Sequence, residues 1–315
     1  MLLALILTFL KNTIYGASVF FTGALSASVD VLDILALRFL LSFLTLYILK
    51  VTKVLKINVG IRDIFRQTPR HPYIKYLLTA ALFEPVLYML FETVGIFMTT
   101  GITAGVILSL GPISSCICEE IILKERTTIA QKIFLGLGIV GVIYIAVNTT
   151  SSGGKDTPLG ILFVVLAVIS GSLFLVFSRK SSKKFSSFET TYFSALLGAV
   201  AFNAANIVRH IAKGDIVNYF TPYLSAENMV GFVFLGIISA VVATSMNNYA
   251  LSKLQVSTVS AFGGVSTLVT ITIGVLVGGE QLHTFHLIGL ALIIMRMVGV
   301  SYIDIQKRKN KKTAE

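Results

Sequence analysis

Long apolar runs separated by short polar connections dominate the chain. They fall near residues 3–25, 32–49, 74–98, 102–123, 129–147, 159–178, 190–210, 229–252, 257–278 and 285–304. Each is roughly 20 residues long, the length that a helix needs to cross a bilayer. The runs do not alternate in polarity as the strands of a membrane barrel would. We therefore predict an all-α integral membrane fold with ten transmembrane helices, since a helix satisfies its own backbone polar groups in lipid.

The composition supports a membrane environment. Of the 315 residues, 55% are hydrophobic and 13% are charged, and the mean hydropathy is +0.85. Soluble domains carry about 25% charged residues, so the surplus apolar surface predicts a lipid bilayer as partner. The net charge of +11 does not indicate a nucleic-acid partner, because the basic residues are divided among several connections and share no single surface.

The distribution of Lys and Arg predicts the orientation. With the N-terminus in the cytoplasm, most of the 26 basic residues fall in cytoplasmic connections or in the C-terminal tail. Only Lys155, Arg209 and Lys213 fall in the connections on the other side. By the positive-inside rule we predict a multi-pass protein of the cell (inner or plasma) membrane with both termini cytoplasmic.

The chain is predicted to consist of two halves. A polar, Gly/Ser-rich linker at residues 148–158 separates the apolar runs of 3–147 from those of 159–304, and a basic tail follows at 305–315. Five helices per half is an odd number, so the second half must enter the membrane from the opposite side. Two inverted five-helix repeats are typical of secondary transporters.

Short motifs follow one another in a fixed order along the two halves. They are Leu37-Arg38-Phe39, Gly101-Ile102-Thr103-Ala104, Gly111-Pro112, Glu125-Arg126-Thr127, Val256-Ser257-Thr258-Val259 and Gly279-Glu280-Gln281-Leu282. In this order and spacing the chain resembles the drug/metabolite transporter superfamily, in its ten-helix form with two EamA-type repeats. The resemblance covers about residues 5–304. It implies a transporter, and an exporter, of amino acids, related amphiphilic metabolites or drugs.

This chain departs from the family pattern at two places. Arg296 stands where such repeats usually place a glycine in the last helix, and the acidic pair Glu84 and Glu92 is not part of the general pattern. Intramembrane ionisable residues cost about 2.5–3.5 kcal/mol each at the centre of a helix, so they are candidates for function.

Three polar residues of the third run are spaced i, i+4 and i+8, namely Glu84, Tyr88 and Glu92. On a continuous helix this spacing keeps them on one face, and Pro85 is expected to bend the helix beside Glu84. We predict that Tyr88 and Glu92 bind substrate and that Glu84 or Glu92 carries a coupling proton. The alternative is a fixed ion pair of either glutamate with Lys11, Arg38 or Arg296.

Four further residues are predicted to bind substrate. Lys11 suits a carboxylate or phosphate, unless it extends to the cytoplasmic interface. Arg296 either binds substrate or packs against the acids of the third run. Asn247 and Asn248 align with Glu92 and Thr93 of the first half, and interhelical hydrogen bonding is an equally good account of them. For Arg38 we predict a structural ion pair.

Signals of catalysis are missing. The chain has no Gly-x-Ser-x-Gly, His-Glu-x-x-His or phosphate-binding Gly-Lys-Ser/Thr motif, so we predict no enzyme, no cofactor and no metal. A membrane-embedded enzyme and a non-transporting sensor or scaffold remain the alternatives to a carrier of a small-molecule substrate. Glu119 and Glu120 are interpreted as solvated at the membrane interface, and Glu125 and Glu280 as caps of the next helix.

Overall fold

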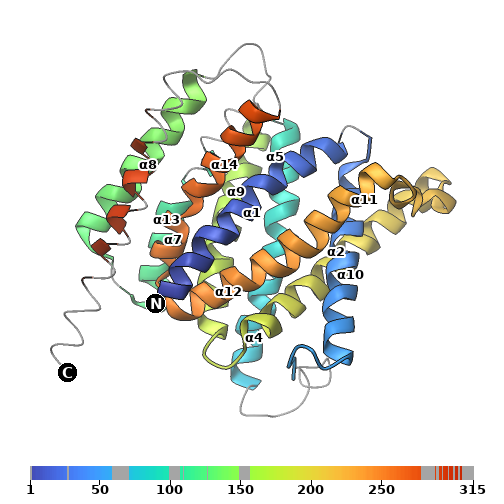
Figure 1. Ribbon diagram of the computed structural model, residues 1–315, viewed down its shortest axis with the longest axis horizontal. Helices are drawn as coiled ribbons and strands as arrows, with labels where there is room; N and C mark the ends of the chain where they lie inside the picture. Colours follow the sequence, from blue (N-terminus) through green and yellow to red (C-terminus); the bar gives the residue numbers. More distant parts are fainter. Residues whose placement is uncertain are drawn as a thin grey trace. The chain divides into compact units, whose positions relative to one another are not determined.

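The described part of the computed structural model is helical. It comprises residues 2–26, 28–58, 71–98, 110–125, 127–148 and 157–277, with a few positions at 107–108 and between 288 and 306, and no strand occurs among them (Figure 1). The motifs at residues 101–104 and 279–282 and most of the linker lie outside the described residues.

Six of the described helices are long and apolar enough to cross a membrane. They are Leu2–Thr22, Val31–Val51, Pro72–Gly95, Pro158–Ser181, Ser187–Lys213 and Ala226–Lys253. Each coincides with one of the predicted apolar runs, which confirms a multi-pass membrane fold. The count of ten helices and their inverted arrangement stay predictions.

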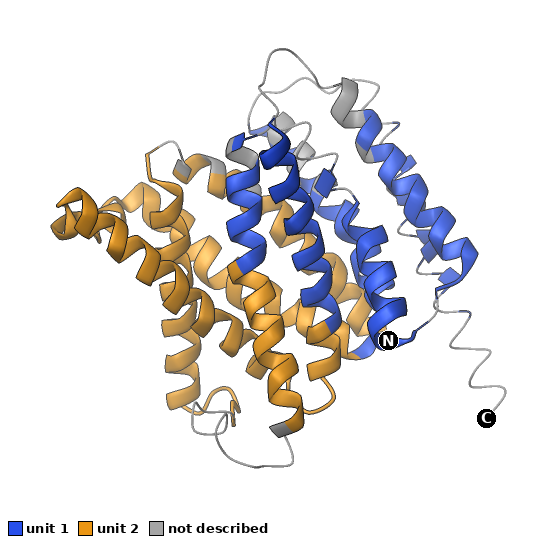
Figure 2. Ribbon diagram, turned by 180° about the vertical axis from the view of Figure 1, so that it is seen from behind, with its two compact units in different colours: residues 1, 87–176, 253–315 blue, residues 2–86, 177–252 orange. Residues whose placement is uncertain are grey.

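The chain forms two compact units (Figure 2). Unit 1 contains residues 87–176 and 253–315, and unit 2 contains residues 2–86 and 177–252. Each unit therefore takes segments from both sequence halves, so these units follow a different division from the repeats of residues 3–147 and 159–304.

Unit 2 is built from long helices with well-defined ends. The Asp30 side chain caps its second helix by accepting from Leu32 N at 3.0 Å. Ser186 and Glu189 form a capping box at the start of α10, and Gly214 ends that helix with a φ of +73°. The α-helices of this unit are α1 (Leu2–Ser26), α2 (Val31–Val51), α4 (His71–Ala81), α10 (Ser187–Lys213), α11 (Ala226–Val233) and α12 (Thr244–Lys253). A kinked segment (Leu82–Leu87) follows α4, and unit 2 contains it as far as Val86. The unit also has 3-10 turns at Ile216–Asn218 and Thr221–Leu224 and a π-helical segment at Phe234–Ala243.

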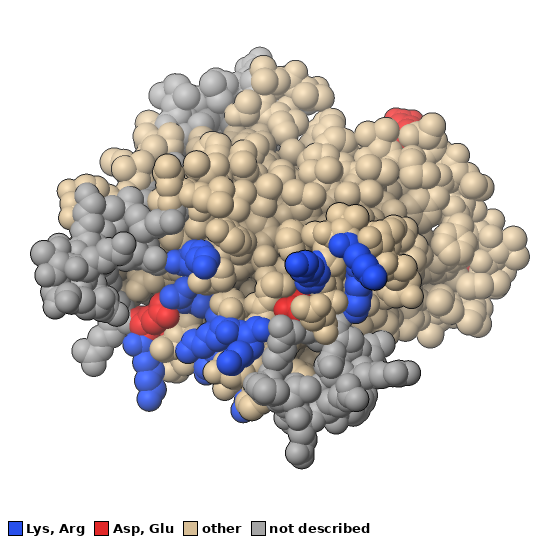
Figure 3. Space-filling model, turned by 60° about the horizontal axis from the view of Figure 1, so that its bottom comes forward, with Lys and Arg blue, Asp and Glu red and all other residues tan. Residues whose placement is uncertain are grey.

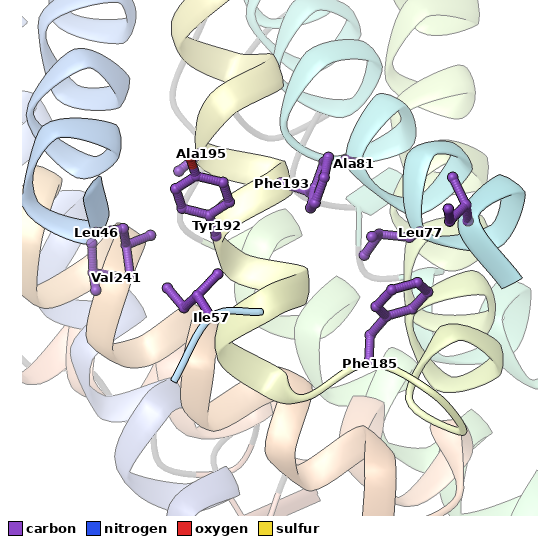
Figure 4. Packing of buried hydrophobic residues seen from close by; sticks show 10 residues of the cluster. Leu46, Ile57, Leu77, Ala81, Phe185, Tyr192, Phe193, Ala195 and Val241 are labelled. Atoms are coloured by element: carbon purple, nitrogen blue, oxygen red, sulfur yellow. The ribbon is translucent and has the colours of Figure 1, made fainter. Parts of the chain in front are cut away.

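Helices α2, α4 and α10 enclose the main apolar cluster of unit 2 (Figure 4). Glycine permits close approach beside it, because a Cβ at Gly198 of α10 would lie 2.8 Å from the Phe39 ring of α2. Small residues at such crossings are how helices pack in lipid, where burial of apolar surface drives no association. The cluster contains Leu46, Ile57, Ile74, Leu77, Ala81, Phe185, Tyr192, Phe193, Ala195 and Val241.

Unit 1 packs around the contact of α7 with α13. Its core contains Cys116, Leu135, Ala261 and Val300. The elements are α5 (Tyr88–Met98), α7 (Gly111–Cys118), a π-helical segment (Glu119–Leu123), α8 (Ile129–Asn148), most of α9 (Pro158–Ser181), α13 (Val256–Ala261) and α14 (Gly263–Leu276).

Candidate functional site

The third predicted span is broken at Glu84. The helix that begins with α4 loses helical backbone geometry at this residue, where φ is −140° and ψ is 122°. Pro85 follows and has no N–H to donate, which accounts for a break at this point. Non-helical backbone at membrane depth occurs where it is buried in protein or lines a polar cavity.

Lys11 of α1 belongs to the same unit as Glu84 and lies within the range of its charge. The Lys11 side chain is buried (6% exposed) and its Nζ lies 5.3 Å from the ring centroid of Tyr15. The charge of Glu84 acts on both Lys11 and Tyr15. The Tyr15 hydroxyl shares a 3.2 Å hydrogen bond with Thr244 Oγ1 of α12.

Arg38 of α2 adds a second cation to this region. Its NH2 group donates to Ser239 Oγ at 3.2 Å, and its guanidinium carbon lies 5.6 Å from the Phe39 ring centroid. The charge of Arg38 also acts on Tyr15. We define the Lys11–Glu84 cluster as these polar residues of unit 2: Lys11, Tyr15, Arg38, Glu84, Ser239 and Thr244.

The cluster combines two cations with one carboxylate. Lys11 is buried, while Tyr15, Arg38 and Glu84 are half-buried. Opposite charges at membrane depth offset part of the cost of burying each one. This combination of charges has the chemistry to accept a carboxylate beside Lys11 and Arg38, and an ammonium group beside Glu84.

Tyr88 and Glu92 form a second polar pair, on α5 of unit 1. The Tyr88 hydroxyl donates to Glu92 Oε1 at 2.7 Å, as expected for residues four apart on a helix. The Tyr88 ring lies against Gly171, where an added Cβ would be 3.1 Å away. The predicted common face of Glu84, Tyr88 and Glu92 needs correction, since the break beside Pro85 interrupts the helix between Glu84 and the other two.

Asn247 and Asn248 of α12 differ in the hydrogen bonds that their side chains make. Asn248 accepts from Ser178 Oγ at 2.7 Å and donates to Thr191 Oγ1 at 3.0 Å, so it bonds between helices. Asn247 is 2% exposed, and its Oδ1 has no hydrogen-bond partner in the described part of unit 2. Buried polar atoms are rarely left in this state, so Asn247 retains the capacity to bind a donor.

Arg296 of unit 1 is buried and makes packing contacts. It is 3% exposed, and its Nε donates to Ala261 O at 3.1 Å. A Cβ at Gly138 would lie 2.1 Å from Arg296 Cδ, so the side chain lies directly on Gly138. Among the residues that the structure describes, no carboxylate forms an ion pair with Arg296.

The interpretation of Glu119 as solvated is wrong. Glu119 is 0% exposed, and its two carboxylate oxygens accept from Val256 N at 2.7 Å and Ser257 N at 2.9 Å. It therefore caps α13, which is far away in the sequence, and no local pattern signals this. Glu120 accepts from Thr127 N at 3.0 Å just before α8 begins.

A buried ionic network in unit 2 also went unpredicted. Asp33 of α2 accepts from Asn206 Nδ2 at 2.8 Å, and its carboxylate lies 2.6 Å from Arg209 and 2.9 Å from His210 Nε2. His210 Nδ1 lies 2.9 Å from Asp215 Oδ1. We call these five residues the Asp33 network. The sequence gives one signal for it. Asp30 and Asp33 stand at the start of the apolar run 32–49, Arg209 and His210 stand at the end of the run 190–210, and both ends are predicted on the same side of the membrane.

A tyrosine extends the polar region beyond the end of α10. Burial raises the pKa of Tyr219, between α10 and α11. The phenol therefore stays protonated and donates to Asn203 Oδ1 at 2.5 Å. The Asp33 network joins α2 to α10 through the hydrogen bonds and ion pairs of Asp33 with Asn206, Arg209 and His210, which favours a structural role.

Comparisons with known proteins give the family. A model of the EamA-like transporter family matches residues 2–147 and 158–302. The chain is 30% identical over 305 residues to the uncharacterized transporter YcxC of Bacillus subtilis (strain 168), covering 97% of this chain and 94% of the relative. It is 24% identical over 231 residues to an uncharacterized transporter of Archaeoglobus fulgidus, covering 72% of this chain and 76% of the relative.

A solved structure illustrates the shared fold. It is described only as the crystal structure of a protein, and it matches with a TM-score of 0.74 at 16% identity, covering 95% of this chain and 98% of the other.

Proposed function

The chain belongs to the EamA-like transporter family and is a multi-pass membrane transporter, and from this premise we propose that it is a secondary carrier working by alternating access. Its substrates in this proposal are small polar metabolites such as amino acids or related amphiphilic compounds, and its direction is export. The family and the relatives' names point to transport rather than catalysis.

The proposed architecture is ten helices in two inverted repeats, with both termini cytoplasmic, in the inner or plasma membrane. The two separate family matches, at residues 2–147 and 158–302, support the repeat. The bias of Lys and Arg between predicted connections supports the orientation. An inverted repeat would provide the two halves whose relative movement exposes a midplane site alternately.

The Lys11–Glu84 cluster is the observation that carries the substrate proposal. Within one unit it places the cations Lys11 and Arg38 and the carboxylate of Glu84 beside a break in a predicted membrane span. Broken helices commonly form the binding sites of secondary transporters. A zwitterion with its carboxylate toward Lys11 would match this arrangement in charge.

The remaining predicted residues contribute unequally to this proposal. Asn247 keeps its place as a candidate ligand, since its Oδ1 is unpartnered among the described residues of unit 2. Tyr88 and Glu92 stay candidates as a pair, and either Glu84 or Glu92 carries the coupling proton in our proposal. The contacts of Arg296 and Asn248 favour structural roles.

Flux measurements in proteoliposomes test the proposal. The purified chain is reconstituted, and counterflow of isotope-labelled amino acids is measured with and without a pH gradient. We expect saturable flux that falls at least about tenfold in Lys11→Met and Glu84→Gln, an effect typical of losing a charged contact. Lys213→Met removes an exposed lysine at the end of α10 and serves as the matched control.

Two results would contradict the proposal. One is folded wild-type protein that moves no amino acid or related metabolite of the panel. The other is Lys11→Met and Glu84→Gln variants that transport as fast as Lys213→Met.

A further inference from the structure

One end of unit 2 carries lysines set against tyrosine rings. Figure 3 shows Lys and Arg side chains gathered on one face of the molecule. The residues come from the predicted cytoplasmic connections and from the helix ends beside them. We call them the lysine–tyrosine patch: Lys50, Tyr73, Lys75, Tyr76, Lys180, Lys184 and Tyr192.

Two ammonium groups approach the ring of Tyr76. The Nζ of Lys75 lies 5.1 Å from the Tyr76 ring centroid, and the Nζ of Lys180 lies 4.7 Å from it. Each contact is favourable by itself, because the face of the ring is negative. Two like charges against one ring nevertheless repel each other, and an anion placed between them would remove this repulsion.

Three lysines of the patch have no acidic partner in the described part of the chain. None of Lys75, Lys180 and Lys184 forms an ion pair there. Glu189, in the first turn of α10, is 2% exposed and accepts from Ser186 N at 2.8 Å and Asn58 N at 3.2 Å. The charges of Lys75, Lys180 and Lys184 are therefore available to an external anion.

The tyrosines continue into an apolar row of rings. Lys184 Nζ lies 6.0 Å from the Tyr73 centroid, and the Tyr73 and Tyr76 centroids are 6.1 Å apart. Tyr76 stacks with Phe177 at 6.2 Å, and Phe177 with Phe83 at 5.9 Å. Ammonium groups beside tyrosine rings, followed by phenylalanine rings, are the arrangement expected where a helix passes from the membrane–water interface into the hydrocarbon core.

We propose that the lysine–tyrosine patch binds the phosphate of an anionic phospholipid, with Lys75 and Lys180 on either side of the phosphate and Tyr76 beneath it. Lys184 and Lys50 add charge at the rim, above Tyr73 and Tyr192. All four lysines flank connections that the positive-inside pattern predicts to be cytoplasmic, so the lipid belongs to the cytoplasmic leaflet, where anionic lipids attract basic segments. This inference is independent of the substrate and direction proposed above.

Native mass spectrometry of the purified full-length chain tests the inference. Affinities are measured for phosphatidylglycerol and for zwitterionic phosphatidylcholine. We expect phosphatidylglycerol to bind more tightly, and its affinity to fall about fivefold for each lysine lost in Lys75→Gln and Lys180→Gln. Phosphatidylcholine binding should not change, and Lys75→Arg/Lys180→Arg should retain phosphatidylglycerol.

The controls distinguish binding at this patch from a general effect of the protein's positive charge. Lys213→Gln removes the same charge at the opposite predicted side and should leave phosphatidylglycerol binding unchanged. Equal losses in Lys213→Gln and Lys180→Gln would overturn the inference, as would wild-type affinity in the Lys75→Gln/Lys180→Gln variant. Complete displacement of phosphatidylglycerol by inorganic phosphate would assign the patch to a soluble anion and overturn the lipid proposal.

Discussion

Arg296 lies directly over Gly138 in unit 1. A Cβ at Gly138 would be 2.1 Å from Arg296 Cδ, 2.7 Å from Nε and 3.0 Å from Cβ. The arginine also donates from Nε to Ala261 O at 3.1 Å, so it cannot move away without losing a buried hydrogen bond. Gly138 therefore leaves the space that the long Arg296 side chain occupies.

Gly138→Ala should destabilise the protein through this contact. The added methyl group must displace Arg296 and break its bond to Ala261 O, at a cost of about 1.5–3 kcal/mol for a hydrogen bond to a charged group. Thermal unfolding of the purified protein in detergent measures the loss. Gly136→Ala, on the same helix with nothing within 4 Å of its added Cβ, is the matched control and should be nearly neutral. Equal unfolding temperatures of the two variants would contradict the prediction.

The charges of the Lys11–Glu84 cluster should be coupled in stability. Lys11→Met removes a cation that offsets Glu84, and we expect it to cost about 1–3 kcal/mol, less than a fully buried pair because Glu84 is half-buried. The double variant Lys11→Met/Glu84→Gln removes both charges and should be more stable than Lys11→Met alone. Thermal unfolding in detergent gives the comparison. Additive losses in the double variant would show that the two side chains do not interact.

The sequence predicted the long helices well. The expected runs at residues 32–49 and 190–210 correspond to Val31–Val51 and Ser187–Lys213, because apolar length is a strong local signal. The break at Glu84 was also partly predictable, since Pro85 cannot continue the hydrogen-bond ladder. A second break, at Phe262 between α13 and α14, has no proline to signal it.

Contacts between distant segments could not be predicted. Glu119 was interpreted from its place near a helix end, and only the fold shows that its partner is the start of α13. Likewise, hydropathy marks Lys11 and Glu84 as unusual but does not show that they lie near each other. Intramembrane charges therefore identify candidate residues, while their grouping depends on the tertiary fold.

Replacing Glu119 should unfold part of unit 1. Glu119→Ala leaves the N–H groups of Val256 and Ser257 without their acceptors at a position where Glu119 is 0% exposed, and each such group costs about 1–3 kcal/mol. Hydrogen exchange of residues 253–261 should accelerate strongly. Glu227→Ala, an exposed acid in the first turn of α11, is the control and should change exchange little. Unchanged protection around Val256 in Glu119→Ala would contradict the assigned cap.

The Asp33 network should stabilise the contact of α2 with α10. Asp33→Asn turns an acceptor of three side chains into a group that also donates toward Arg209 and His210, and we expect a loss of about 2–3 kcal/mol. Asp30→Asn is the control, because Asp30 also pairs with Arg209 but its side chain is 51% exposed, so its loss should stay below about 1 kcal/mol. Thermal unfolding should rank the variants in this order. In a double-mutant cycle, Asp33→Asn and His210→Gln should couple by at least about 0.5 kcal/mol, as residues in one network do. If Asp33→Asn is no less stable than Asp30→Asn, the network does not stabilise this contact.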